Sequence, residues 1–151
     1  MKKIVTLAAM SLLLSATAFA QSVKEKKAWD TINEESKTAT ESLKEACGVG
    51  ITIMPDKSWT ALEDIEGPAR WCISTGESAI RSLCKDADYK AAVAKSLKKV
   101  TCVNDPKLPH DGQEAKSGNK FSFKGGVLEW RYNKDTANMD QHVTEFLKGA
   151  L

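Results

Sequence analysis

Apolar residues recur at helical spacing over residues 22–47 of the chain. They form one stripe between charged positions, made of Trp29, Ile32, Ala39, Leu43 and Ala46. Ser22 and Gly48 suit the start and the end of this helix. Two interpretations of the stripe are open: a coiled-coil partner helix, or a helix that faces the core of its own domain. Because the segment spans fewer than ~4 heptads and has alanine in the stripe, we expect the core-facing helix.

The next part of the chain predicts a strand, a central helical segment and a second strand. Residues 49–54 alternate with a period of two and are rich in β-branched side chains, which indicates a strand. Short helices are expected over 56–65, from Pro68 to Cys84, and, after a cap at Asp88, through Lys98. The inner face of the second is expected to hold Trp71, Cys72, Ile80, Leu83 and Cys84. Residues 99–103 again indicate a strand.

The clearest local pattern is a β-hairpin over residues 120–133. Apolar and polar residues alternate on both sides of Gly125-Gly126, which is typical of a two-residue hairpin turn. Residues 104–119, which precede it, show no period and are expected to form a loop. A C-terminal helix is expected after a cap at Asp135 or Thr136, with its buried face formed by Met139, Val143, Phe146 and Leu147.

This order of elements predicts an α+β fold. We expect a small, mainly antiparallel sheet of about four strands, with a long N-terminal helix, a central helical segment and a C-terminal helix packed on one face. Residues 21–151 are long enough to form one domain with a single core.

The first 20 residues have the features of a signal peptide. Lys2 and Lys3 precede an apolar run, and Ala18-Phe19-Ala20 matches an A-x-A cleavage site. The run is shorter than the ~20 residues that span a bilayer, so we expect cleavage after Ala20 and no membrane insertion afterwards. The mature chain is therefore expected in the periplasm, or secreted.

The four cysteines all follow the predicted signal peptide, and an even number in an oxidising compartment indicates two disulfides. If residues 69–85 form one helix, Cys72 and Cys84 lie about 18 Å apart along it, which is too far for a bond. Two connectivities then remain. Because they close the shorter loops, Cys47–Cys72 with Cys84–Cys102 are favoured.

The charge balance bears on the class of partner. Two of the 22 basic residues, Lys2 and Lys3, lie in the first 20 positions, which hold no acid, so residues 21–151 have 20 charges of each sign. A neutral chain has no long-range field that attracts polyanions, and we therefore expect no nucleic-acid partner.

Candidate catalytic or metal-ligating residues are few. His110 and Asp111 lie in the long loop and His142 lies on the last helix. A small exported hydrolase or a metal-binding protein would need the loop to fold back onto that helix, because no metal-ligand spacing occurs within either segment. Solvated histidines are the more usual outcome, so no catalytic residue and no cofactor is assigned, and this function is kept as the alternative.

The hairpin carries the strongest indication of a binding surface. Trp130, Arg131 and Tyr132 are the candidate residues, since aromatic and arginine side chains are enriched in interfaces. Arg131 must project from the face opposite its neighbours, and Trp130 and Tyr132 are equally explained as core residues. The hairpin edge also offers a place for a partner strand. We therefore expect a non-enzymatic exported binding domain, an inhibitor or an envelope accessory protein, whose partner is a protein or another envelope component.

Overall fold

Five helices and four strands make up the part of the chain that the computed structural model describes, residues 5–109, 118–136 and 139–151. In chain order they are α1 (Val5–Cys47), β1 (Thr52–Pro55), α2 (Leu62–Glu66), α3 (Pro68–Leu83), α4 (Ala87–Ser96), β2 (Lys99–Asn104), β3 (Asn119–Lys124), β4 (Val127–Tyr132) and α5 (Met139–Ala150). The predicted α+β fold with four strands is therefore confirmed. Among these residues, no helix combines the length and apolarity needed to cross a bilayer.

The sheet is mixed, with the strand order β1-β2-β4-β3. The β3–β4 hairpin is antiparallel as predicted, but β1 pairs with β2, and β2 with β4, in parallel. The expectation of a mainly antiparallel sheet is wrong. The reason is that α2, α3 and α4 carry the chain back along the sheet before β2 begins, as a crossover between parallel strands requires.

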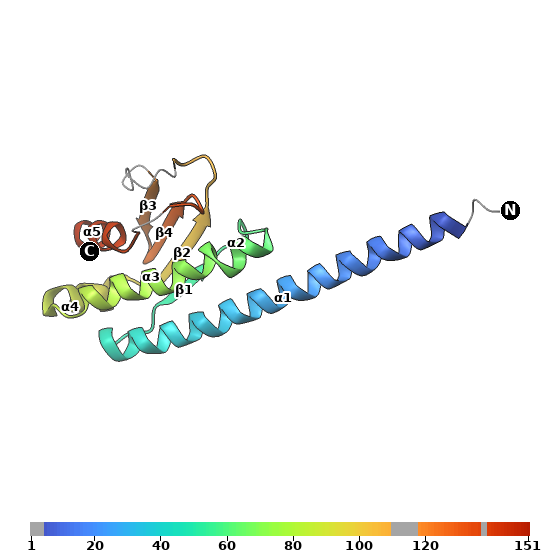
Figure 1. Cartoon of the computed structure of the whole chain (residues 1–151). Coiled ribbons are helices and arrows are strands. Elements are labelled where there is room, and N and C mark those ends of the chain that lie inside the picture. The colour runs from blue at the N-terminus through green and yellow to red at the C-terminus, as the bar shows by residue number, and fades with distance from the viewer. Residues whose placement is uncertain (1–4, 110–117, 137–138) are drawn as a thin grey trace.

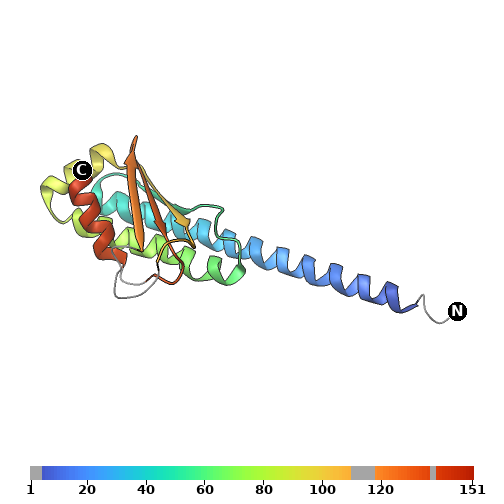
Figure 2. The ribbon, with the colours of Figure 1, turned by 90° about the horizontal axis from the view of Figure 1, so that it is seen from above.

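The helices pack on one face of the sheet, and α1 projects beyond it (Figures 1 and 2). Ile53 of β1 lies against α3 at Gly76, and Phe121 of β3 stacks on Phe146 of α5. The buried positions of α1 include Ile32 and Leu43, so this helix faces the core of its own domain, as expected. Along β1 and β4 these buried positions alternate with more exposed ones on the opposite face, and β2 follows the same alternation except at Val103, which is also buried.

Two details of the helical segment differ from the sequence-based expectation. The segment expected to be helical over 56–65 is irregular up to Ala61, and α2 covers only its end. Helix α4 begins two residues earlier than a cap at Asp88 implies, because the Asp86 side chain, and not that of Asp88, accepts the capping hydrogen bonds from the N–H groups of Asp88 and Tyr89.

Helices α1 and α3 lie side by side and run in the same direction. Glu35 of α1 binds Arg70 of α3, and Ser42 donates a hydrogen bond to Glu77, and the partners are 35 positions apart in both pairs. A constant difference in residue number is the signature of parallel helices, because both partners advance together along their axes.

This parallel arrangement decides the disulfide connectivity. Cys47 is bonded to Cys84 and Cys72 to Cys102, so two disulfides are present but the favoured pairing is wrong. Cys47 and Cys84 are 37 residues apart, close to the difference that relates the other contacts between the two helices. Cys72 lies about 18 Å earlier on α3 and so cannot reach Cys47. Because Cys72 points to the sheet instead, it meets Cys102 of β2.

The hairpin turn provides a direct test of the packing at the end of the sheet. Gly125 and Gly126 both have positive φ, +61° and +83°, but only Gly126 is crowded. A Cβ atom there would lie 2.9 Å from the Ser96 carbonyl oxygen, whereas a Cβ at Gly125 meets nothing within 4 Å. We expect Gly125→Ala to lower the free energy of unfolding by about 1–2 kcal/mol through backbone strain alone. Gly126→Ala should lower it by about 2–4 kcal/mol, because the turn must also move away from Ser96.

Urea denaturation of the two variants measures this difference. Equal losses of stability in Gly125→Ala and Gly126→Ala would show that the turn does not pack against the end of α4.

Candidate functional site

The structure places two of the three predicted binding residues in the core. Trp130 and Tyr132 are both 0% exposed and lie beside each other, with ring centroids 4.7 Å apart. The Trp130 indole Nε1 donates to Asn119 Oδ1 at 2.7 Å, and the Tyr132 hydroxyl donates to the Pro68 carbonyl oxygen at 2.8 Å. Burial raises the pKa of Tyr132 well above its ordinary value. Both side chains therefore hold the sheet against the helices, and neither is open to a partner.

Arg131 lies on the opposite face of the sheet, as its position in the alternation predicts. Its Nε donates to Glu129 Oε1 at 2.7 Å, and this hydrogen bond raises the pKa of Arg131. The Arg131 side chain is 42% exposed, so it remains accessible while paired. An exposed pair of this kind contributes little to stability.

Only one residue of the alternative metal or hydrolase site lies in the described part of the chain. His110 and Asp111 lie outside the described residues, and His142 is a half-buried residue of α5. Within residues 5–109, 118–136 and 139–151, no group of three His, Cys, Asp or Glu side chains is placed to hold a metal ion.

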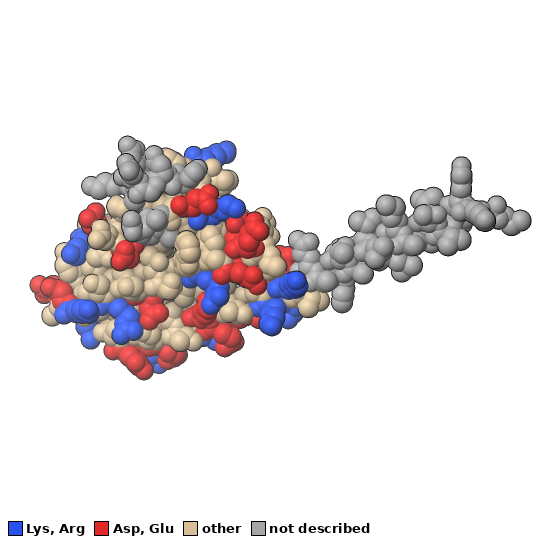
Figure 3. Space-filling model, viewed as in Figure 1, with Lys and Arg blue, Asp and Glu red and all other residues tan. Residues whose placement is uncertain are grey.

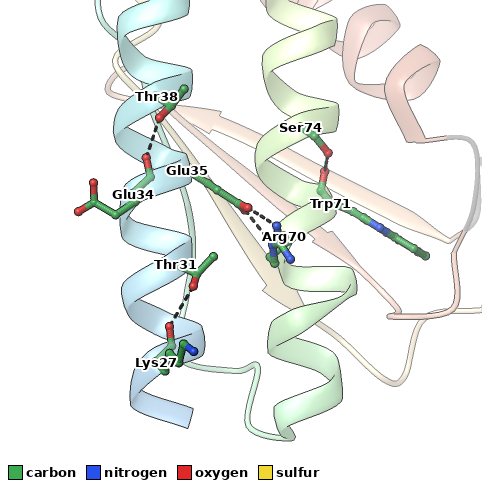
Figure 4. A network of polar contacts seen from close by, with 8 residues as sticks. All are labelled: Lys27, Thr31, Glu34, Glu35, Thr38, Arg70, Trp71 and Ser74. Atoms are coloured by element: carbon green, nitrogen blue, oxygen red, sulfur yellow. Dashed lines mark hydrogen bonds and ion pairs between the residues drawn. The ribbon is translucent and has the colours of Figure 1, made fainter. Parts of the chain in front are cut away.

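A groove of about 450 Å³ runs between α1 and α3. Glu35 reaches across it from α1 to Arg70 of α3, with 2.9 Å between Arg70 Nε and Glu35 Oε2 and a second contact between Nη2 and Oε1 (Figure 4). This pairing raises the pKa of Arg70. The two-point contact fixes the guanidinium across the groove.

Trp71 follows Arg70 on α3 and borders the same groove. In Figure 4 its ring points away from α1. The side chain is 53% exposed, whereas Trp59 and Trp130 are 1% and 0% exposed and Trp29 is half-buried. An indole in water without a covering residue is unusual, because burial of such a ring is strongly favourable.

Trp71 was expected on the inner face of its helix, and this expectation is wrong. The inner face of α3 is formed by Ala69, Cys72, Ile73, Gly76, Ala79, Ile80 and Leu83. Trp71 belongs to the opposite stripe, together with Ser74, Ser78 and Arg81, at spacings of three and four residues. That polar stripe was the signal in the sequence that placed Trp71 outward.

Charges around the groove are mixed. Arg81 contacts both Ser42 and Glu77, at 3.0 and 3.4 Å, and so extends the polar contacts between the helices. Basic and acidic side chains are interspersed over the face of the molecule in Figure 3. The groove therefore combines fixed ion pairs with one exposed aromatic ring.

Comparison with protein-family models, curated proteins and solved structures finds no match to the chain.

Proposed function

We propose that the chain is an exported, non-enzymatic binding protein that contacts a macromolecular partner through Trp71 and the groove between α1 and α3. The proposal rests mainly on the exposure of the Trp71 side chain to solvent. Tryptophan and arginine are the residues most enriched among those that dominate binding energy, and here they are neighbours on one helix. Arg70 is held by Glu35, so the rim of the groove is ordered before a partner arrives.

The proposed location is the periplasm or the cell exterior. Disulfides persist in oxidising compartments, and the two in this chain join α1 to α3 and α3 to β2. They clamp α3 near its start, at Cys72, and at its end, at Cys84, which makes it a rigid platform for Trp71. A rigid surface of this type suits an inhibitor or an envelope accessory protein.

Replacement of Trp71 by alanine tests the proposal. The variant should keep the thermal stability of the wild type, because the ring is largely in water, and should bind its partner about 30-fold more weakly or worse. The measurement is affinity capture of the oxidised chain (residues 21–151) from envelope extract, with cross-linking and mass spectrometry. The captured protein is then titrated against both forms.

Val127→Ala is the matched control, because Val127 is an exposed apolar residue on the other face of the sheet, 37% exposed. It should capture the same partner at wild-type strength. Equal capture by Trp71→Ala and the wild type would refute the assignment of this surface, and the absence of any captured macromolecule would refute the proposed function.

A further inference from the structure

The two edges of the sheet differ in whether another element of the chain bonds to their outward backbone groups. At β1, two outward carbonyl groups are already bonded to α1: Ser36 Oγ donates to the Ile53 oxygen at 2.7 Å, and Thr40 Oγ1 donates at 3.3 Å to the oxygen of Ile51, the residue before the strand. Helix α1 therefore closes this edge. The opposite edge is formed by β3, the last strand in the order (Figure 1).

The backbone groups that face outward from β3 follow from the hydrogen bonds of β4. The Tyr132 carbonyl oxygen accepts from Asp105 N at 2.9 Å, on the β2 side. Because alternate residues of a strand bond to opposite sides, Val127, Glu129 and Arg131 bond to β3. Their partners in β3 are Lys124, Ser122 and Lys120.

Phe121 and Phe123 then direct their N–H and C=O groups away from the sheet. No hydrogen bond outside the sheet ladder involves residues 120–124 within the described part of the chain. The edge of β3 thus presents two donors and two acceptors on backbone that is already extended.

The side chains give this edge two chemically distinct sides. On the side away from the helices, Lys120 and Lys124 are exposed, and neither has an ion pair with a described residue. On the helix side, Phe121, Phe123 and Phe146 are half-buried, and Phe121 stacks on Phe146 with 4.9 Å between ring centroids. A strand added here would have one face against cations and the other against partly exposed aromatic rings.

We propose that the free edge of β3 binds an extended segment of a partner protein in which acidic residues alternate with apolar ones. Phe121 and Phe123 supply the backbone hydrogen bonds of strand addition. Lys120 and Lys124, about 13 Å apart along the strand, pair with acidic side chains on one face of the segment. The apolar side chains on its other face cover the exposed parts of the phenylalanine rings.

The same charges argue against a second copy of this chain at the edge. Pairing of β3 with β3 would bring Lys120 and Lys124 of one copy beside those of the other, and like charges across a strand pair are unfavourable. This edge uses none of the residues of the α1–α3 groove, so the two proposals succeed or fail independently.

The test uses the full oxidised chain and an eight-residue peptide of alternating Glu and Val. Amide hydrogen exchange, resolved by NMR, should show the amides of Phe121 and Phe123 protected about ten-fold or more at saturation. The Ser122 amide, which already lies in the ladder, should change little. A Lys-Val peptide of the same length, and a Glu-Val peptide with a central proline, should give no such protection.

Charge reversal of the edge completes the test. Lys120→Glu with Lys124→Glu should weaken binding of the Glu-Val peptide about ten-fold or more. Lys90→Glu with Lys95→Glu, which makes the same change in net charge on exposed positions of α4, should leave binding within about two-fold of the wild type. The proposal is overturned if both pairs weaken binding equally or if Phe121 and Phe123 gain no protection. It is also overturned if these amides become protected with rising protein concentration alone, since that would assign the edge to a second copy.

Discussion

Replacement of Trp130 by alanine is expected to lower the free energy of unfolding by about 3–5 kcal/mol. The indole is 0% exposed and contacts Tyr132 and Phe121, with centroid distances of 4.7 and 6.1 Å. Its removal leaves a cavity between the sheet and the helices and deletes the hydrogen bond from Nε1 to Asn119 Oδ1. The cost therefore combines lost apolar burial, an unfilled volume and a lost buried hydrogen bond.

Urea denaturation followed by far-ultraviolet circular dichroism measures this loss without dependence on tryptophan fluorescence. Trp71→Ala is the control, because it makes the same chemical change at a 53% exposed position and should cost at most about 0.5 kcal/mol. If the two variants were equally stable, Trp130 would not be the core residue that its burial indicates.

The loss of either disulfide should have an effect of similar size. Double replacement of Cys72 and Cys102 by alanine is expected to cost about 4 kcal/mol or more. Release of a loop closed over 30 residues accounts for roughly 3–4 kcal/mol of this, and both positions are 0% exposed, so packing is lost as well. Double replacement of Cys47 and Cys84, which are 37 positions apart, should cost roughly 3–4 kcal/mol.

Non-reducing peptide mapping by mass spectrometry checks the connectivity that these variants assume. Fragments containing Cys47 and Cys84 should be linked, as should those with Cys72 and Cys102. Alkylation without reductant should label no cysteine. A linked fragment with Cys47 and Cys72 would contradict the parallel packing of α1 and α3. If the two cysteine double variants unfolded at the same urea concentration as the wild type, the disulfides would not be what holds these helices in place.

Most of the local structure follows from the sequence because it depends on neighbours in the chain. The hairpin required only alternation around Gly125-Gly126, and its strands occur where that alternation places them. The apolar stripe of 22–47 identified the core face of α1, since every third or fourth residue of a helix lies on one side.

The candidate sites were harder to predict from the sequence. The hairpin pattern placed Arg131 outside and left Trp130 and Tyr132 open to two interpretations, because an aromatic residue on an alternating strand looks the same whether it packs on a helix or meets a partner. Trp71 was missed because a large apolar residue was assumed to face inward, although its neighbours at helical spacing are polar.

The sequence by itself determined the order and type of the elements, the presence of two disulfides and the alternation of buried and exposed positions along the strands. All of these depend on composition and local periodicity. The tertiary structure alone decided the direction of β1 and β2, the partner of each cysteine, and which sheet edge stays open. The strand direction depends on the crossover through α2, α3 and α4, and the open edge depends on the contact of α1 with β1. The partner of each cysteine depends on how α1 and α3 align across the core. That alignment is set by contacts between residues 35 or more positions apart, and no local pattern encodes them.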